Sequence, residues 1–135
     1  MFFCFDFGIK KIGLSIGQQI SKTVSLLKPF KINNGKINWL KIKYLLKFWN
    51  PISVVIGLPI NNNKSLLLIF LILKFSIVFY KKFNVYIFFH NEYLSTIEAK
   101  KFFLIYKKKY KIKDIYIDSI SSKLILKSWF IDNKY

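Results

Sequence analysis

Three carboxylates are the side chains of this sequence that are best suited to chemistry. The chain has only six Asp and Glu residues, and three of them, Asp6, Glu92 and Asp118, fall where a strand or helix is expected to begin or end. Carboxylate oxygens are the ligands that Mg²⁺ and Mn²⁺ prefer in proteins. Two such ions about 4 Å apart can clamp the attacking and leaving oxygens of a phosphoryl displacement. These acids therefore predict a two-metal site for a phosphodiester substrate.

The remaining acids have structural explanations. Glu98 follows Ser95 by three residues, which is the spacing of a helix-capping box. Asp114 lies in a lysine-rich segment, where it is solvated or caps a helix, and Asp132 lies in the C-terminal tail, where disorder is common.

Other reactive side chains are few. His90 is the single histidine and follows an apolar strand, so a structural role is expected. Cys4, the single cysteine, is expected to be a buried apolar side chain. The sequence contains no GxSxG, P-loop or HExxH pattern.

The net charge of +17 comes from 23 basic residues, all of them lysine. One interpretation is a polyanionic partner such as a nucleic acid. The other is mutational drift, because Lys, Ile, Asn and Phe, whose codons are rich in A and T, dominate the composition. The two interpretations stay open at this point.

Hydropathy patterns predict the elements that must position the acids. Apolar runs predict strands at 2–7, 20–32, 52–57 and 84–90, with a further strand starting near Gly13. Helices are predicted at 37–49, 65–82, 95–109 and 117–130. The first of these shows an apolar stripe of helical spacing at Ile37, Leu40, Tyr44, Leu45 and Phe48.

This order of elements predicts an α/β fold in a single domain, 1–135. An antiparallel three-strand start followed by two strand–helix alternations gives a mixed sheet with parallel inner strands and helices on its faces. Catalytic groups collect at the carboxyl ends of parallel strands in such sheets. Asp6 and Glu92 would meet there, and the last helix could bring Asp118 beside them.

The apolar segment 65–80 is expected to pack on the sheet or in a dimer contact. Its uninterrupted apolar part is far shorter than the ~20 residues that a bilayer requires, and Lys74 interrupts it. We therefore expect no stable membrane span and either a monomer or a homodimer. No secretory signal is visible, so a cytoplasmic location is expected.

Four motifs in this order resemble the YqgF family of pre-16S ribosomal RNA nucleases, which are related to Holliday-junction resolvases. The resemblance covers essentially the whole chain. The motifs are Phe5-Asp6-Phe7-Gly8 followed by Lys10 and Ile12-Gly13, then Val55-Ile56-Gly57-Leu58-Pro59, then the run from His90 to Ala99, then Asp118-Ser119.

The resemblance implies a ribonuclease H-like fold, whose five-stranded mixed sheet has the order 3-2-1-4-5. It implies a metal-dependent nuclease that processes the 5′ end of pre-16S ribosomal RNA with Mg²⁺ or Mn²⁺. Its acidic triad falls on Asp6, Glu92 and Asp118. Three residues are candidate nucleic-acid contacts: Lys10, Ser95 and Thr96.

The sequence also departs from the family pattern. Asn91 and Tyr93 flank Glu92 where the family usually has Asp and Arg, which removes a phosphate contact. Three other functions remain open: a resolvase of branched DNA, a non-catalytic RNA-binding assembly factor, and an actin-like ATPase, although the last needs a second lobe.

Overall fold

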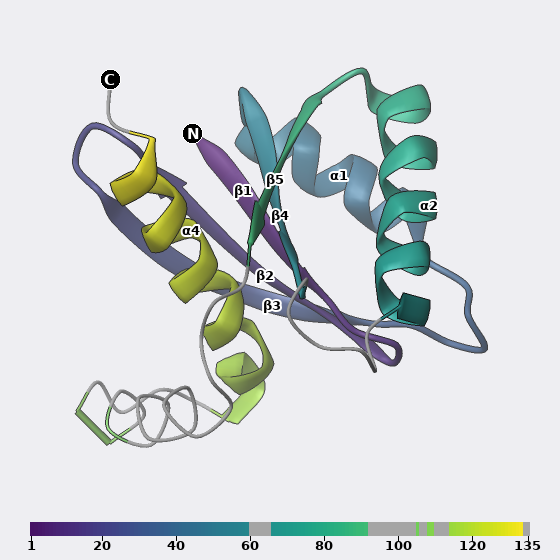
Figure 1. Ribbon diagram of the computed structural model, residues 1–135, viewed down its shortest axis with the longest axis horizontal. Helices are drawn as coiled ribbons and strands as arrows, with labels where there is room; N and C mark the ends of the chain where they lie inside the picture. The colour runs from purple at the N-terminus through teal and green to yellow at the C-terminus, as the bar shows by residue number, and fades with distance from the viewer. Residues whose placement is uncertain (60–65, 92–104, 106–107, 110–113, 134–135) are drawn as a thin grey trace.

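In a computed structural model of the protein, one five-stranded sheet has helices on both of its faces (Figure 1). The structure describes residues 1–59, 66–91, 105, 108–109 and 114–133. The strands are β1 (Phe2–Phe7), β2 (Lys11–Gln18), β3 (Thr23–Lys31), β4 (Ser53–Leu58) and β5 (Tyr86–Asn91). The helical elements are α1 (Trp39–Trp49), α2 (Leu66–Phe83), the 3₁₀ helix η2 (Asp114–Ser119) and α4 (Ile120–Asp132).

The strand order is β3-β2-β1-β4-β5, which confirms the predicted mixed sheet. β1 pairs antiparallel with β2, and β2 with β3, whereas β1–β4 and β4–β5 are parallel. β1 is therefore the central strand. Its nearly unbroken apolar sequence fits a strand that is buried on both faces.

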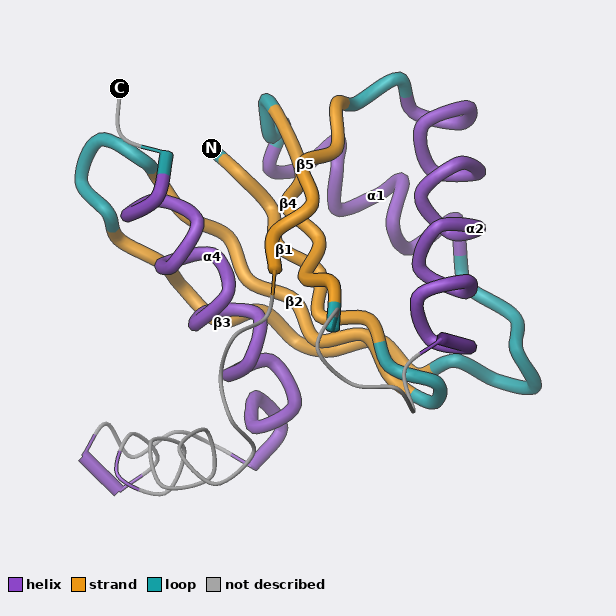
Figure 2. Tube along the Cα trace, viewed as in Figure 1, coloured by secondary structure: helices purple, strands orange, loops and turns teal. Residues whose placement is uncertain are grey.

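Side-chain alternation along β1 divides the core into two layers. Phe3, Phe5 and Phe7 belong to a cluster with the buried residues of α1 and α2, while Phe2 and Cys4 pack with α4. Figure 2 shows α1 and α2 on one side of the sheet and α4 on the other. Cys4 is fully buried, as predicted.

Helix α1 is confirmed, but the stripe that predicted it is not its buried face. Leu40, Tyr44 and Phe48 are all at least 66% exposed, and Ile42 and Leu46 are buried instead. The helix is apolar on two faces, so periodicity predicted the helix without indicating its orientation. Its ends follow the sequence signals: the Asn38 side chain accepts a hydrogen bond from the N–H of Lys41, and a left-handed Asn50 ends the helix.

Helix α2 covers the same sheet face as α1. The helices of the described residues include none with the length and apolar character needed to cross a membrane. The predicted helix at 95–109 lies almost wholly outside the described residues. The last predicted helix is divided into η2 and α4, so Asp118 lies in the 3₁₀ segment before α4. Asp132, predicted to lie in a tail, is the final residue of α4.

Candidate active site

Asp6 extends the α4-facing side of β1 beyond the apolar core. Side chains alternate along a strand, so Asp6 projects to the same face as Phe2 and Cys4. The parallel pairing of β1 with β4 extends from Phe2 to Phe5, so Asp6 lies at the carboxyl end of the central strand. Its side chain is intermediate in exposure, between the core and solvent.

The backbone of Asp118 packs against Gly13, the residue opposite Asp6 in the sheet. Gly13 is the antiparallel partner of Asp6, and directly opposed residues project to the same face. A Cβ on Gly13 would lie far inside van der Waals contact of the Asp118 carbonyl oxygen. Opposed Cβ atoms are about 5 Å apart, so the Asp6 side chain begins within about 8 Å of that oxygen. The fold thus places the backbone of Asp118 beside the strand position of Asp6.

Ser119 fixes the end of η2 against the sheet. The β2–β3 register shifts between Ile12 and Leu14, where Pro29 lies in β3. The fully buried Ser119 hydroxyl accepts a hydrogen bond from the Leu14 N–H (3.1 Å) and donates one to the Leu27 carbonyl (2.6 Å). It thereby pairs backbone groups of both strands at the irregularity. Asp118, the preceding residue, is held beside β2.

A lysine contacts Asp118 directly. The Lys11 ammonium lies 3.0 Å from a carboxylate oxygen of Asp118, with both side chains about half exposed (51% and 45%). An exposed pair of this kind contributes at most about 1 kcal/mol. The predicted nucleic-acid contact, Lys10, is exposed and precedes β2. The lysine that contacts Asp118 is Lys11, the residue after Lys10.

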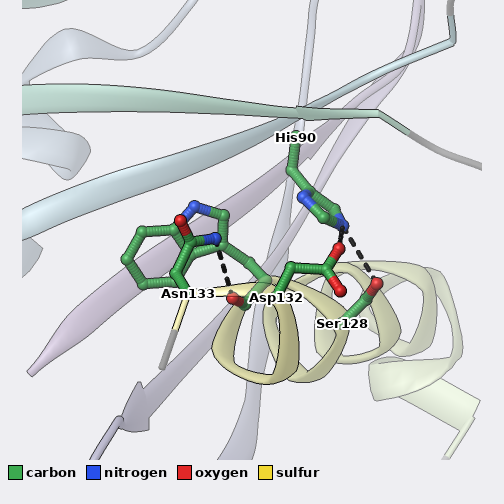
Figure 3. Close-up of polar contacts among 5 residues, drawn as sticks. His90, Ser128, Asp132 and Asn133 are labelled. Carbon is green, nitrogen blue, oxygen red and sulfur yellow. Dashed lines mark hydrogen bonds and ion pairs between the residues drawn. The ribbon is translucent and has the colours of Figure 1, made fainter. Parts of the chain in front are cut away.

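His90 connects the end of β5 to α4 (Figure 3). Its Nε2 lies 2.9 Å from the Ser128 hydroxyl and 3.7 Å from an Asp132 carboxylate oxygen. Burial lowers the pKa of His90 below the ordinary value of 6.5, and the Asp132 carboxylate partly opposes this by raising the pKa. Both partners contact the same ring nitrogen, so the three residues do not form a nucleophilic relay. The structural role predicted for His90 is supported, and the residue anchors the strand that leads to Glu92.

Three predicted site residues, Glu92, Ser95 and Thr96, lie outside the described residues. Within the described part of the chain, no group of three His, Cys, Asp or Glu side chains is arranged to hold a metal ion. The site as described therefore consists of two carboxylates, Asp6 and Asp118, and the lysine beside them.

Sequence reasoning missed the residues that join these acids. In the sequence, Gly13 stands out only near the start of a strand and in the Ile12-Gly13 motif, and Ser119 only in the Asp118-Ser119 motif. The role of these two residues in positioning Asp118 has no local signal, because it depends on contacts between residues more than 90 positions apart in the chain. The adjacency of Ser119 to an expected metal ligand was the one available indication.

Relatives with similar sequences were found over nearly the whole chain. A protein of Buchnera aphidicola subsp. Schizaphis graminum, named as a pre-16S rRNA nuclease, is 41% identical over 97% of this chain and 96% of its own length. Proteins with the same name from Blochmanniella floridana and Serratia proteamaculans are 37% and 40% identical, over 96% and 93% of this chain and 92% and 91% of their own lengths.

Solved structures share the fold. RuvC of Thermus thermophilus in complex with a Holliday junction substrate superposes with a TM-score of 0.61 at 12% identity, over 96% of this chain and 94% of the other. The Fowlpox virus Holliday junction resolvase gives a TM-score of 0.53 at 19% identity, over 97% and 96%. These likenesses confirm the ribonuclease H-like fold. A family model described as RuvX, Holliday junction resolvase, matches residues 1–132. The chain therefore belongs to the RuvX family.

Proposed function

We propose that this protein is a metal-dependent nuclease, a hydrolase of phosphodiester bonds, in which Asp6, Glu92 and Asp118 hold two divalent cations. The observation that carries the proposal is that Gly13 pairs with Asp6 in the sheet and packs against the Asp118 carbonyl, at the carboxyl end of the central strand. Glu92 follows the last residue of β5, which is parallel to β1 in the same sheet. The carboxyl ends of parallel strands collect catalytic groups.

The donor set fits Mg²⁺ or Mn²⁺. Asp6 and Asp118 offer only oxygen atoms, and the Asp118 side chain is accessible to solvent. If held there by Asp6, Asp118 and Glu92, two such ions would supply Lewis-acid stabilisation of the phosphate charge in a phosphodiester hydrolysis. The chain's own task is then to hold the carboxylates in place, through the contacts of Gly13 and Ser119 with the end of η2.

Positive charge beside the acids supports phosphate binding. Lys11 lies next to Asp118, and its partner across the β2–β3 ladder is Lys31, which is also exposed. Lysine neutralises phosphate as a point charge and does not read bases through bidentate contacts. Lys10, together with Ser95 and Thr96 in the family motif, would add contacts to the nucleic-acid backbone.

The proposed substrate is the 5′ end of the pre-16S ribosomal RNA, cut in the cytoplasm during ribosome assembly. Its support is the name shared by relatives that are 37–41% identical over nearly the whole chain. The proposed active unit is the single domain 1–135, because the described strands belong to one sheet.

Branched DNA is the second candidate substrate. It is favoured by the description of the family model, Holliday junction resolvase. Phosphodiester hydrolysis at two metal ions is the same for both polymers, so the acids do not discriminate between them.

The test is a cleavage assay of the purified protein on pre-16S ribosomal RNA, single-stranded RNA and four-way DNA junctions, with Mn²⁺, Mg²⁺ or chelator. Cleavage of the ribosomal precursor that requires a divalent ion and is lost in the Asp6→Asn/Asp118→Asn variant is expected. Preferred cleavage of the junction would support the second candidate.

Two outcomes would contradict the nuclease proposal. The first is cleavage that persists in chelator or in the double Asn variant. The second is RNA binding without cleavage by the unmodified protein, which would indicate a non-catalytic assembly factor. The Asp132→Asn variant serves as the matched control, because this acid lies beside His90 at the last residue of α4, whereas Asp118 precedes the first residue of that helix. It should cleave at the rate of the unmodified protein.

A further inference from the structure

A stripe of exposed apolar side chains runs along α2 from Leu66 to Tyr80. Leu66, Phe70, Leu73, Ile77 and Tyr80 are exposed by 43 to 75%. They follow one another at intervals of four, three, four and three residues, which is the spacing of a heptad seam. The stripe lies on a different side of α2 from the residues that the helix buries against the sheet, among them Ile72, Phe75 and Phe79.

An α-helix that is apolar all round belongs in an interior. The sheet covers only one face of α2, and the stripe itself contains no charged residue. Helix α1 also has exposed apolar residues, at Leu40, Tyr44 and Phe48, but only three of them. The stripe on α2 is longer and adjoins further apolar surface.

That adjoining surface is a groove between α2 and the edge strand β5. The groove has a volume of about 520 Å³ and is lined mainly by apolar and aromatic side chains, namely Leu73, Ile77, Tyr80, Tyr86, Ile87 and Phe89. β5 is at the end of the strand order, so one of its edges carries no partner strand within the described sheet. Unprotected edges of this kind favour association with another chain.

We propose that a second copy of this chain covers this surface, with the two α2 helices packed antiparallel across a two-fold axis near Leu73. In that arrangement Leu66 of one copy meets Tyr80 of the other, and Phe70 meets Ile77. A symmetric dimer uses the same patch on both copies. The α2 stripe satisfies this condition, because its residues are spaced almost equally on either side of Leu73.

The available area is sufficient for a stable dimer. Eight apolar and aromatic side chains of α2 and β5 contribute to it, namely Leu66, Leu67, Phe70, Leu73, Ile77, Tyr80, Tyr86 and Phe89. Each exposes on the order of 100 Å², which gives roughly 800 Å² per copy, the size of a standard specific interface. The patch also exceeds the few hundred Å² of contiguous apolar surface that monomers usually expose.

The interface leaves the candidate active site open. Helix α2 covers one face of the sheet, and Asp6 and Asp118 lie on the α4 side. The dimer is therefore independent of the proposed nuclease activity, and either proposal can fail without the other.

Charge gives the association a characteristic salt dependence. Lys74 and Lys81, both exposed, flank the stripe, and each copy carries a net charge of +17. Like charges oppose the approach of two copies, and salt screens them. Self-association should therefore strengthen between 50 and 500 mM salt, whereas binding to an acidic partner would weaken.

The experiment is sedimentation equilibrium of the full chain and two charge variants. Phe70→Glu places a carboxylate in the seam, and Phe48→Glu places one at an equally exposed phenylalanine of α1 (63% and 66%). The unmodified protein and Phe48→Glu should dimerise, and Phe70→Glu should raise the dissociation constant at least about 30-fold, as expected of an interface hot spot. A monomer at all salt concentrations, or a dimer that only Phe48→Glu disrupts, would overturn the proposal.

Cross-linking supplies an independent measurement. Leu73→Cys places a thiol on the axis, and oxidation should join two copies through it. Leu40→Cys on α1 is the matched control and should not cross-link, and the native Cys4 is fully buried. A Leu73→Cys protein that stays monomeric under oxidation contradicts the antiparallel arrangement. Binding of the unmodified monomer to anionic lipid vesicles, lost in Phe70→Glu, would instead assign the stripe to a membrane surface.

Discussion

Gly13 faces the carbonyl oxygen of Asp118 so closely that any side chain would displace the end of η2. Gly13→Ala should therefore move Asp118 away from Asp6. Overpacking against backbone typically costs about 1–3 kcal/mol of folding stability. Misplacement of a catalytic group by 1 Å can reduce the rate about 100-fold. We expect a loss of that order in metal-dependent cleavage, measured on a folded variant.

Gly35→Ala is the control for this prediction. Gly35 has a positive φ of 73°, so alanine is strained there, but no atom lies within 4 Å of its added Cβ. Its stability should fall by about 1 kcal/mol because of the left-handed backbone, and its cleavage rate should not change. If the two variants lose activity equally, the proposed role of Gly13 is wrong.

Ser119 should be important for stability as well as for the site. Ser119→Ala removes the hydroxyl that pairs the Leu14 N–H and the Leu27 carbonyl. A buried backbone group left without a partner costs about 1–3 kcal/mol. We expect a decrease of that size in the free energy of unfolding, measured with urea, together with weaker Mn²⁺ binding measured by calorimetry.

Ser15→Ala is the contrasting substitution. Ser15 is also fully buried, but its hydroxyl has no hydrogen-bond partner among the described residues. Removal of an unsatisfied hydroxyl is neutral or stabilising. Equal destabilisation by the two substitutions would show that the bridge from Ser119 contributes nothing specific.

Between elements, the contact of β5 with α4 should respond to pH. Burial lowers the pKa of His90 below 6.5 in the folded state. Below pH 6.5 the unfolded state therefore binds a proton more readily than the folded state. The free energy of unfolding should be highest above pH 6.5 and should decrease as the pH falls toward the folded-state pKa. Urea titrations between pH 5 and 8 measure this decrease.

Two variants isolate the contribution of His90. His90→Gln should lose the pH-dependent component, because His90 is the only histidine in the chain. Asp132→Asn should enlarge it, because this carboxylate raises the pKa of His90 and so reduces the shift. A pH dependence that is unchanged in both variants would assign it to other groups.

The predicted strands and helices agree with the structure where the hydropathy pattern alone is enough to identify the element. The apolar run of β1 required no distant contact to be interpreted. The face that α1 buries could not be predicted, because two apolar stripes compete and the sheet selects Ile42 and Leu46. Likewise, strand ends predict that Asp6 and Glu92 meet and that the last helix brings Asp118 beside them, but the contact of Asp118 with Gly13 depends on the β1–β2 register.

For the molecule as a whole, the charge of +17 is compatible with a polyanionic partner and with drift in composition. The positions of individual lysines on the fold allow these two explanations of the charge to be tested separately. Lys11 and Lys31 are cross-strand partners beside Asp118, although like charges in that arrangement destabilise a sheet. Lys43 and Lys47 are exposed on α1, across the sheet from the acids.

The Lys11→Gln/Lys31→Gln variant should bind single-stranded RNA more weakly and with a shallower salt dependence. Each lost phosphate contact removes about 0.7 from the slope of log K against log salt concentration, so the slope should decrease by about 1.4. Lys43→Gln/Lys47→Gln lowers the net charge of +17 by the same two units and should leave the slope unchanged. Fluorescence anisotropy from 50 to 300 mM salt measures both. Equal decreases would mean that RNA responds to the overall charge; a decrease confined to the first variant would place the phosphate path beside Asp118.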